Sequence, residues 1–163
     1  MSTPDPRWLN DEERHAWMTL MSLIFRLGPA LDTQLRRDAG ITHFEYGVMV
    51  GLAQTPEHTM RMSVLAALTD GSLSRLSQVV SRLEKAGWVR RTTDPSDGRY
   101  TLATLTSAGH AKVEESAPAH VNEARRLVFD PLTKTQVRQL ATIGRRILDA
   151  ISTDDPSPPD HLP

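Results

Sequence analysis

Residues 72–109 have the sequence SLSRLSQVVSRLEKAGWVRRTTDPSDGRYTLATLTSAG, in which a helical repeat is followed by two short strand-like runs. Ser72 can cap a helix that runs to Ala86 and ends at Gly87, a residue suited to a left-handed C-terminal position. On a helical wheel the large apolar side chains of this helix fall within about 100° of one another. They are Leu76, Val79, Val80 and Leu83. The segment therefore predicts an amphipathic helix with one buried face.

The polar face of this helix carries serine, glutamine and arginine, whereas a merely solvated face more often carries glutamate and lysine. Glutamine can pair with adenine, arginine can pair with guanine, and serine can donate to bases or phosphates. We therefore predict a DNA recognition helix, with a solvated structural helix as the alternative. The predicted DNA contacts are Ser74, Arg75, Ser77, Gln78, Ser81 and Arg82.

A β-hairpin is predicted after the helix, because residues 88–93 and 100–105 are short runs rich in Thr, Val and aromatic residues. The six residues between them favour a turn, in which Gly98 allows a tight tip. Arg99 then projects from a narrow ribbon that suits the minor groove, and Asp97 is placed to hold its guanidinium. The alternative is a surface hairpin with an incidental ion pair, which contributes little.

Helical periodicity also dominates the residues before this segment. A short helix at residues 62–68 and a turn at residues 69–71 precede the recognition helix, which is the order of a winged helix-turn-helix. A first helix of nearly thirty residues is predicted from Asp11 to about Arg37, with a kink at Pro29. We expect so long a helix in so short a chain to cross a second subunit.

Capping boxes at residues 42–45 and 133–136 open two more helices, and another helix is predicted at about residues 107–129 with a kink at Pro118. The last helix has an apolar stripe, formed by Val137, Leu140, Ile143, Ile147 and Ile151. The predicted fold class is therefore mostly α (α+β), a winged helix-turn-helix with a two-stranded β wing and long helices at both ends.

The charge of the chain is distributed unevenly, although its 20 acidic and 19 basic residues leave a net charge of only −1. Residues 71–100 carry six basic and three acidic side chains, a net +3, so the remainder carries −4. A basic segment on an acidic body suits a localised anion-binding face. An ordinary solvated surface explains the charge alone equally well.

The sequence does not favour an enzyme. The chain has no cysteine, which excludes disulfides, thiolate nucleophiles, thiol redox sensing and zinc sites that need sulfur. The six histidines form no His-x-x-x-His pair, and the chain has neither a phosphate-binding glycine loop nor a Gly-x-Ser-x-Gly motif. His110 and Glu114 have the spacing of a surface pair. We therefore expect no metal and no cofactor.

The N-terminus is polar and rich in proline, without the basic-then-apolar pattern of a signal peptide. No stretch approaches the roughly 20 apolar residues of a membrane span. We therefore expect a cytoplasmic protein without membrane attachment.

The run from Leu73 to Arg91, with the segment from Asp94 to Arg99 and the motif Leu105-Thr106-x-x-Gly109, resembles the core of the MarR family. These are bacterial transcriptional regulators of the multiple-antibiotic-resistance type. The resemblance extends over residues 8–151. It implies a homodimer built from the first and the last two helices, with two winged lobes that bind a pseudo-palindromic DNA operator. It also implies that the six helix residues above contact DNA, and that Asp97 and Arg99 act in the wing.

The resemblance also suggests how the chain is organised. We predict a flexible N-terminal tail at residues 1–9, a single MarR-like domain at residues 10–151 and a disordered, Pro-rich tail at residues 152–163. Within the domain the DNA-binding lobe covers about residues 42–106, and the dimerisation helices cover about residues 10–38 and 107–151.

Many members of the family respond to small amphipathic or aromatic molecules where the dimerisation helices meet the DNA-binding lobe. The hypothesis for this chain is a ligand pocket near Trp17, Met21, Phe25 and Phe44, because these large side chains lie on early helices near that junction. Packing in the core explains the same side chains at least as well.

Two functions from different classes therefore stay open. The first is a homodimeric transcriptional regulator, acting as a repressor, whose partners are double-stranded DNA, a second copy of the chain and a small effector. The alternative is a winged-helix protein–protein assembly module without sequence-specific DNA binding.

Overall fold

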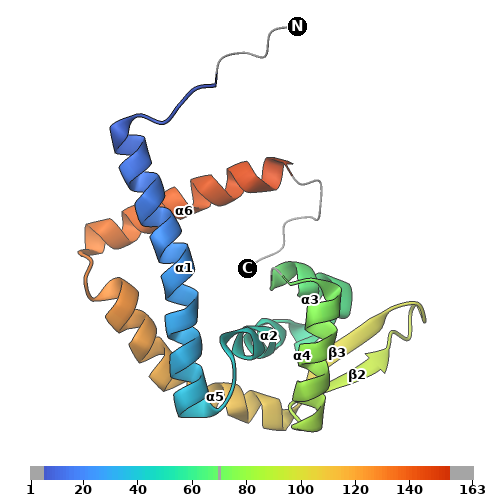
Figure 1. Ribbon diagram of the computed structural model, residues 1–163. Coiled ribbons are helices and arrows are strands. Elements are labelled where there is room, and N and C mark those ends of the chain that lie inside the picture. Colours follow the sequence, from blue (N-terminus) through green and yellow to red (C-terminus); the bar gives the residue numbers. More distant parts are fainter. Residues whose placement is uncertain (1–5, 70, 155–163) are drawn as a thin grey trace, which may run out of the picture. The chain divides into compact units, whose positions relative to one another are not determined.

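The computed structural model describes residues 6–69 and 71–154 and is mostly helical, with one small antiparallel sheet (Figure 1). The elements are α1 (Asp11–Ala39), α2 (His43–Ala53), the 3-10 turn η1 (Pro56–His58), β1 (Thr59–Arg61), α3 (Met62–Leu68), α4 (Leu73–Lys85), β2 (Val89–Thr93), β3 (Thr101–Leu105), α5 (Ser107–Ala124), the π-helical turn η2 (Arg125–Phe129) and α6 (Lys134–Asp154). The predicted mostly α winged-helix class is confirmed.

The chain divides between Glu123 and Ala124 into two compact units. Most of each predicted tail lies outside the described residues, at residues 1–5 and 155–163. Helix α6 extends to Asp154, three residues beyond the predicted end of the last helix.

Helix α1 begins at Asp11, as predicted, and is capped at both ends. The side chain of Asn10 accepts a hydrogen bond from the Glu13 N–H at 2.8 Å, and the Glu13 carboxylate accepts one from the Asn10 N–H at 3.0 Å. Gly40 ends the helix with a φ of +69°, a left-handed conformation that glycine adopts without steric cost. The helix continues through Pro29 for 29 residues in all. The kink expected at that proline stays a prediction.

The predicted caps of α2 and α4 are also confirmed. Thr42 and Glu45 form the capping box that opens α2. The Ser72 hydroxyl accepts a hydrogen bond from the Arg75 N–H at 3.2 Å and opens α4. After α4 the chain turns at Gly87, whose φ is +77°. These contacts fix where α4 starts and stops.

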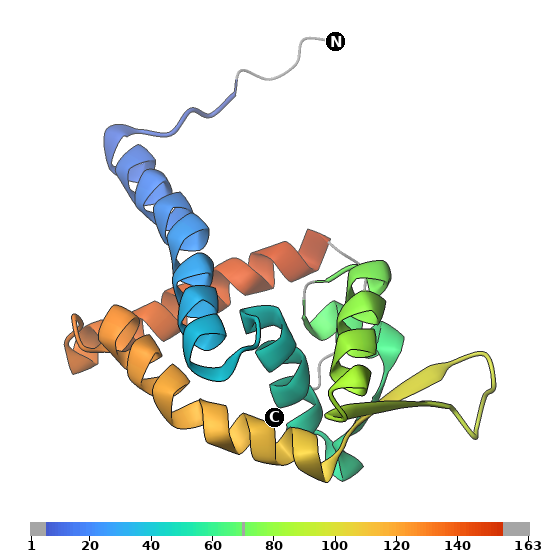
Figure 2. The ribbon, with the colours of Figure 1, turned by 60° about the horizontal axis from the view of Figure 1, so that its bottom comes forward.

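The sheet has three strands in the order β1–β3–β2, all antiparallel, where the sequence predicted two. Strands β2 and β3 form the predicted hairpin and extend as an arm beyond α4 (Figures 1 and 2). Strand β1 adds to the other edge of β3, and the hydroxyls of Thr59 and Thr104 lie 2.8 Å apart across that pair. The short strand therefore ties the beginning of α3 to the base of the wing.

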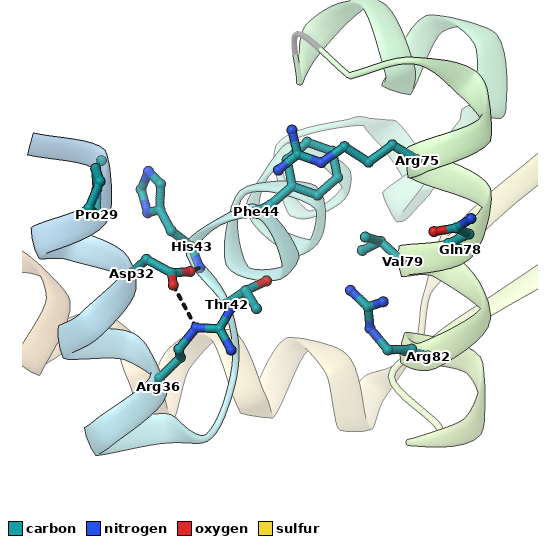
Figure 3. A pocket seen from close by; sticks show the side chains of 11 residues that line it. Pro29, Asp32, Arg36, Thr42, His43, Phe44, Arg75, Gln78, Val79 and Arg82 are labelled. Atoms are coloured by element: carbon teal, nitrogen blue, oxygen red, sulfur yellow. Dashed lines mark hydrogen bonds and ion pairs between the residues drawn. The ribbon is translucent and has the colours of Figure 1, made fainter. Parts of the chain in front are cut away.

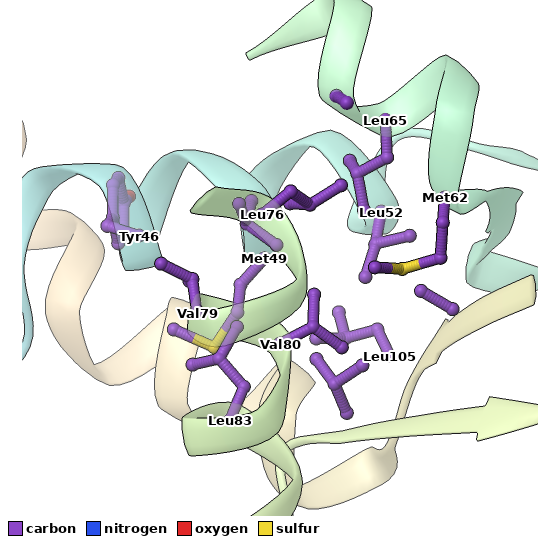
Figure 4. Packing of buried hydrophobic residues seen from close by; sticks show 14 of the residues in the cluster. Tyr46, Met49, Leu52, Met62, Leu65, Leu76, Val79, Val80, Leu83 and Leu105 are labelled. Atoms are coloured by element: carbon purple, nitrogen blue, oxygen red, sulfur yellow. The ribbon is translucent and has the colours of Figure 1, made fainter. Parts of the chain in front are cut away.

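The core of the lobe lies between α2, α3, α4 and the sheet (Figure 4). Its members are almost all aliphatic, as the low aromatic content of the sequence requires. The buried hydrophobic residues are Leu35, Ile41, Tyr46, Val48, Met49, Leu52, Met62, Leu65, Ala66, Leu76, Val79, Val80, Leu83, Val89, Ala103 and Leu105. All four residues predicted for the apolar face of the recognition helix belong to this core. Helix α4 is thereby held in one rotation about its axis.

Helix α6, in the second unit, opens with the predicted capping box, in which the Thr133 N–H donates to the Gln136 side chain at 2.9 Å. Four of the five residues of its predicted apolar stripe are exposed, namely Leu140, Ile143, Ile147 and Ile151. Within the described residues, no helix is both long enough and apolar enough to cross a bilayer.

Gly109, in the first turn of α5, lies directly against the base of the wing. A Cβ atom at this position would lie 2.1 Å from the Trp88 carbonyl oxygen and 2.6 Å from a methyl group of Leu105. The backbone can approach so closely only because glycine has no side chain.

We predict that Gly109→Ala destabilises the protein by about 1–3 kcal/mol or more, because the methyl group must displace backbone rather than a flexible side chain. The matched control is Gly47→Ala in α2, where a Cβ meets nothing within 4 Å. The control should be neutral or stabilise by about 0.5–1 kcal/mol. Chemical denaturation of both variants measures the difference, and equal stability of the two would contradict the close approach.

Candidate nucleic-acid interface

Four of the six predicted helix contacts are exposed on α4, namely Ser74, Arg75, Gln78 and Arg82. Their outward position follows from the packing of the opposite face of the helix, where Leu76 and Val80 are completely buried. A 13-residue helix with one face fixed in the core can offer such side chains to the major groove, which admits an α-helix.

Ser77 and Ser81 are half-buried, and both face an arginine from the wing. Arg91 donates from Nη2 to the Ser81 hydroxyl at 3.0 Å and from Nη1 to the Ser77 hydroxyl at 3.5 Å. The same guanidinium donates from Nε to the Glu84 carboxylate at 2.7 Å. The structure therefore places Arg91 of β2 over the two serines that were predicted to contact DNA.

Arg82 is also engaged within the protein. It donates from Nε to Glu45 of α2 at 2.9 Å, and Glu45 is nearly buried. Burial raises the pKa of the Glu45 carboxyl, but the hydrogen bonds from the Thr42 backbone and from Arg82 outweigh this effect and hold the pKa below its usual value. Glu45 thus caps α2 and also anchors α4 through Arg82.

The wing residues have the predicted arrangement. Arg99 donates from Nε and Nη2 to the two carboxylate oxygens of Asp97, at 2.9 and 2.6 Å. These bonds hold the pKa of Asp97 below its usual value. The Arg99 side chain is 82% exposed, so the pair contributes little to stability. Its effect is to fix the direction of a guanidinium that stands in solvent.

The base of the wing is braced by a second carboxylate, Asp94, which is buried. It accepts hydrogen bonds from the Ser96 hydroxyl at 2.6 Å, from the Ser96 N–H at 2.8 Å and from Arg61 Nε at 2.8 Å. Arg61 also lies over the ring of Tyr100, 4.3 Å from its centroid. Asp94 therefore connects the start of the wing tip to β1.

The sequence profile of the MarR family matches residues 39–99. Sco3205, a MarR family transcriptional regulator from Streptomyces coelicolor whose crystal structure contains DNA, is 42% identical, with a TM-score of 0.85 over 91% of this chain and 92% of that chain. The chain belongs to the MarR family.

Two further relatives agree with this assignment. AbsC, a MarR family transcriptional regulator from Streptomyces coelicolor, is 34% identical with a TM-score of 0.84, over 91% of this chain and 99% of that chain. The HTH-type transcriptional repressor Rv2887 of Mycobacterium tuberculosis is 30% identical over 135 residues, 81% of this chain and 92% of that protein. The chain is thus a transcriptional regulator and not an enzyme, and the comparisons do not support an assembly module.

A cavity of about 620 Å³ opens between α1, α2 and α4 of this MarR-family regulator (Figure 3). Its wall combines apolar surface with cationic groups, and it is lined by Gly28, Pro29, Asp32, Arg36, Thr42, His43, Phe44, Arg75, Gln78, Val79 and Arg82. The guanidinium of Arg75 lies over the Phe44 ring, 4.3 Å from its centroid. Asp32 accepts hydrogen bonds from Arg36 Nε at 2.5 Å and from the His43 N–H at 2.8 Å.

Of the four residues predicted to form a ligand pocket, only Phe44 lines this cavity. The part of α1 that lines it begins at Gly28, so Trp17 lies about 16 Å away along the helix axis at 1.5 Å per residue. The side chains of Trp17 and Phe25 are mostly exposed, and Met21 is half-buried.

The structure describes no metal centre. His110 Nδ1 and Glu114 Oε1 lie 3.5 Å apart, as expected of a surface pair. Among residues 6–69 and 71–154, no three His, Asp or Glu side chains gather closely enough to hold an ion.

The sequence reasoning did not identify Glu45, Arg61, Glu84, Arg91 or Asp94 as parts of this interface. Glu45 was assigned only to a capping box. The other four lie among ordinary charged residues, and their partners come from a different helix, strand or turn. The only available signal was the excess of basic residues in residues 71–100. It indicated which segment carries the positive charge, but it did not indicate which carboxylates pair with these side chains.

A pH-dependent contribution to stability follows from Asp94, because the Ser96 hydrogen bonds and Arg61 lower its pKa from 3.8 to about 2. A depressed carboxyl pKa in the folded state contributes stability that is fully present above pH 3.8 and is lost as the pH falls towards 2. We predict that Asp94→Asn removes this part of the acid dependence and lowers stability at neutral pH. Ser96→Ala should raise the pKa of Asp94 only part of the way back to 3.8, because the bond from Arg61 remains.

The measurement is an NMR titration of the Asp94 carboxyl carbon together with unfolding free energies from pH 2 to 7. An unshifted Asp94 titration near 3.8 would contradict the brace.

Proposed function

We propose that this MarR-family regulator binds duplex DNA as a homodimer and acts as a repressor in the bacterial cytoplasm. The observation that carries the proposal is the exposed Arg99 guanidinium at the wing tip, which is held by two hydrogen bonds to Asp97. The wing follows α4 in the chain, and the outward face of α4 carries Ser74, Arg75 and Gln78. Sco3205, which is described in complex with DNA, and the repressor Rv2887 support it.

The two elements of the lobe divide the work of recognition. The exposed face of α4 contacts bases in the major groove, where each base pair offers a distinct pattern of donors and acceptors. Arg99 enters the minor groove, where it responds to groove width and negative potential more than to base identity. Asp97 is a positioning residue, since it orients Arg99 without adding positive charge.

Dimerisation buries the apolar surfaces that each unit leaves exposed by itself. Helix α1 exposes Trp17, Met18, Leu23, Ile24 and Phe25, and α6 exposes Leu140, Ile143, Ile147, Leu148 and Ile151. Large apolar patches on soluble chains mark interaction sites. We propose that helices at about residues 10–38 and 107–151 join two copies, each with a DNA-binding lobe at about residues 42–106. A two-fold dimer of this kind binds a pseudo-palindromic operator.

We further propose that a small amphipathic or aromatic ligand releases the protein from DNA. The cavity between α1, α2 and α4 suits such a ligand better than the surface around Trp17 and Phe25. Phe44 and Pro29 offer an apolar wall, and Arg36 and Arg82 offer donors for a carboxylate. Arg75, Gln78 and Arg82 belong to the recognition helix, so a ligand in the cavity contacts that helix directly.

The division of labour predicts different losses for two variants. Arg99→Ala should weaken binding to most duplexes, most strongly beside A·T-rich flanks, and should lower the salt slope by about one. Gln78→Ala should cost about 1–3 kcal/mol on the preferred operator and much less on unrelated DNA. Asp97→Ala should resemble a milder Arg99→Ala, because the charge remains and only its orientation is lost.

Binding isotherms on operator and scrambled duplexes at several salt concentrations measure these effects. If Arg99→Ala lost only specificity while Gln78→Ala lost only general affinity, the assignment of both elements would be wrong. Weak duplex binding with no salt dependence would support the assembly module instead.

The effector proposal predicts that at least one compound in a panel of lipophilic phenols and aromatic carboxylates raises the melting temperature and weakens operator binding. Arg36→Gln should reduce the response to carboxylates, because it removes a donor from the cavity wall. Arg26→Gln is the matched control, since Arg26 lies on the same helix but not in the cavity. No change in either property across the panel would count against an effector.

A further inference from the structure

A second hollow, of about 250 Å³, lies between α4 and the wing. Its walls come from the beginning of α3, the first half of α4, and both strands of the hairpin. Two arginines, Arg91 and Arg99, line it together with the hydroxyl-bearing residues Ser63, Ser77 and Thr101. Among the described residues, those that line the hollow include no acidic side chain.

Arg91 lines this hollow although Glu84, Ser77 and Ser81 all accept hydrogen bonds from it. Glu84 accepts hydrogen bonds from both the Arg91 backbone N–H, at 2.9 Å, and Nε, at 2.7 Å. Ser81 and Ser77 accept from its two terminal nitrogens. Its side chain is nevertheless 31% exposed.

Both arginines have more N–H donors than the acceptors that residues 6–69 and 71–154 supply to them. A guanidinium has five N–H donors in a fixed plane and no acceptor. Arg99 gives Nε and Nη2 to Asp97, so Nη1 is left for a further acceptor. Arg91 gives one bond from Nη1 to Ser77, so this nitrogen keeps a second N–H. The carboxylates of Glu84 and Asp97 bind these arginines but do not line the hollow. The remaining N–H donors are therefore left for a ligand within it.

The geometry of duplex DNA indicates which ligand this is. If α4 lies in the major groove and the wing in the adjacent minor groove, the one sugar–phosphate strand that separates these grooves must pass between them. We propose that the hollow between α4 and the wing is a seat for a backbone phosphate of that strand, with Arg91 as its principal donor and Arg99 beside it. The proposal rests on the proposed DNA-binding function.

This assignment changes the role of two predicted contacts. Ser77 and Ser81 orient Arg91, and they contact DNA only through it. Phosphate contacts of this kind set the register of a protein on the duplex, whereas base contacts provide specificity. Arg91 therefore fixes how deeply α4 enters the groove, and Gln78 depends on that register.

The test is a scan of the operator duplex with single methylphosphonate substitutions, each of which removes one phosphate charge. Wild-type protein should lose about tenfold or more in affinity at one phosphate per half-site, on the strand between the two grooves. Arg91→Gln should bind the unmodified operator more weakly and should show no further loss at that phosphate, while its sensitivity at the other phosphates remains. Arg90→Gln is the matched control, because adjacent side chains on a strand face opposite ways, and it should keep the full loss at the seat.

A second variant keeps the test informative if Arg91→Gln does not fold. Ser77→Ala with Ser81→Ala leaves the charge of Arg91 but removes its two hydroxyl partners, so it should reduce the loss at the same phosphate. If Arg91→Gln kept the wild-type pattern of losses, or if the serine variant altered different phosphates, the seat would be wrong. If wild-type protein bound no duplex at all, the proposed function would fail, and this inference with it.

Discussion

Helix α4 can present a polar face to a ligand only because its other face is fixed in the core. Leu76, Val80 and Leu83 are almost completely buried against α2, α3 and the sheet, so the helix cannot rotate without exposing them. Burial of such side chains contributes about 1.5–3 kcal/mol each, which far exceeds the contribution of any exposed ion pair. This packing determines that Gln78 points outward and where the wing lies relative to α4. It also shapes the cavity between α1, α2 and α4 and the hollow between α4 and the wing.

Four carboxylates of the lobe hold four arginines on this frame. Glu45 holds Arg82, Glu84 holds Arg91, Asp94 holds Arg61 and Asp97 holds Arg99. Each pair lowers the net positive charge of the lobe, which is a cost for a protein that binds an anion. In return the guanidinium groups have defined directions before any ligand arrives, so less side-chain entropy is lost on binding. The near-neutral net charge of the chain is therefore compatible with DNA binding.

The sequence predicted the local features of this fold well. Helix bounds followed from Thr42, Ser72 and Gly87, because caps act on residues three or four positions away. The apolar face of α4 and the Asp97–Arg99 pair were equally local. Strand β1 was missed because three residues carry no measurable periodicity, and it exists only through its pairing with β3.

The contacts that shape the interface are of a different kind. Glu45 and Arg82 are 37 residues apart, and Arg61 and Asp94 are 33 apart, so no spacing in the sequence connects them. The cavity could not be placed for the same reason, since its wall combines three helices. The sequence thus predicted which residue types would contact DNA, and tertiary packing decided which of them face solvent and which hold another side chain.

The central claim is that two copies of this lobe bind one duplex through a two-fold axis. Sequencing of the genomic DNA fragments that the purified protein retains tests it most directly. The account predicts inverted repeats with half-site centres about one helical turn, roughly 10 bp, apart. Direct repeats, unordered single sites or no enrichment over input DNA would contradict it.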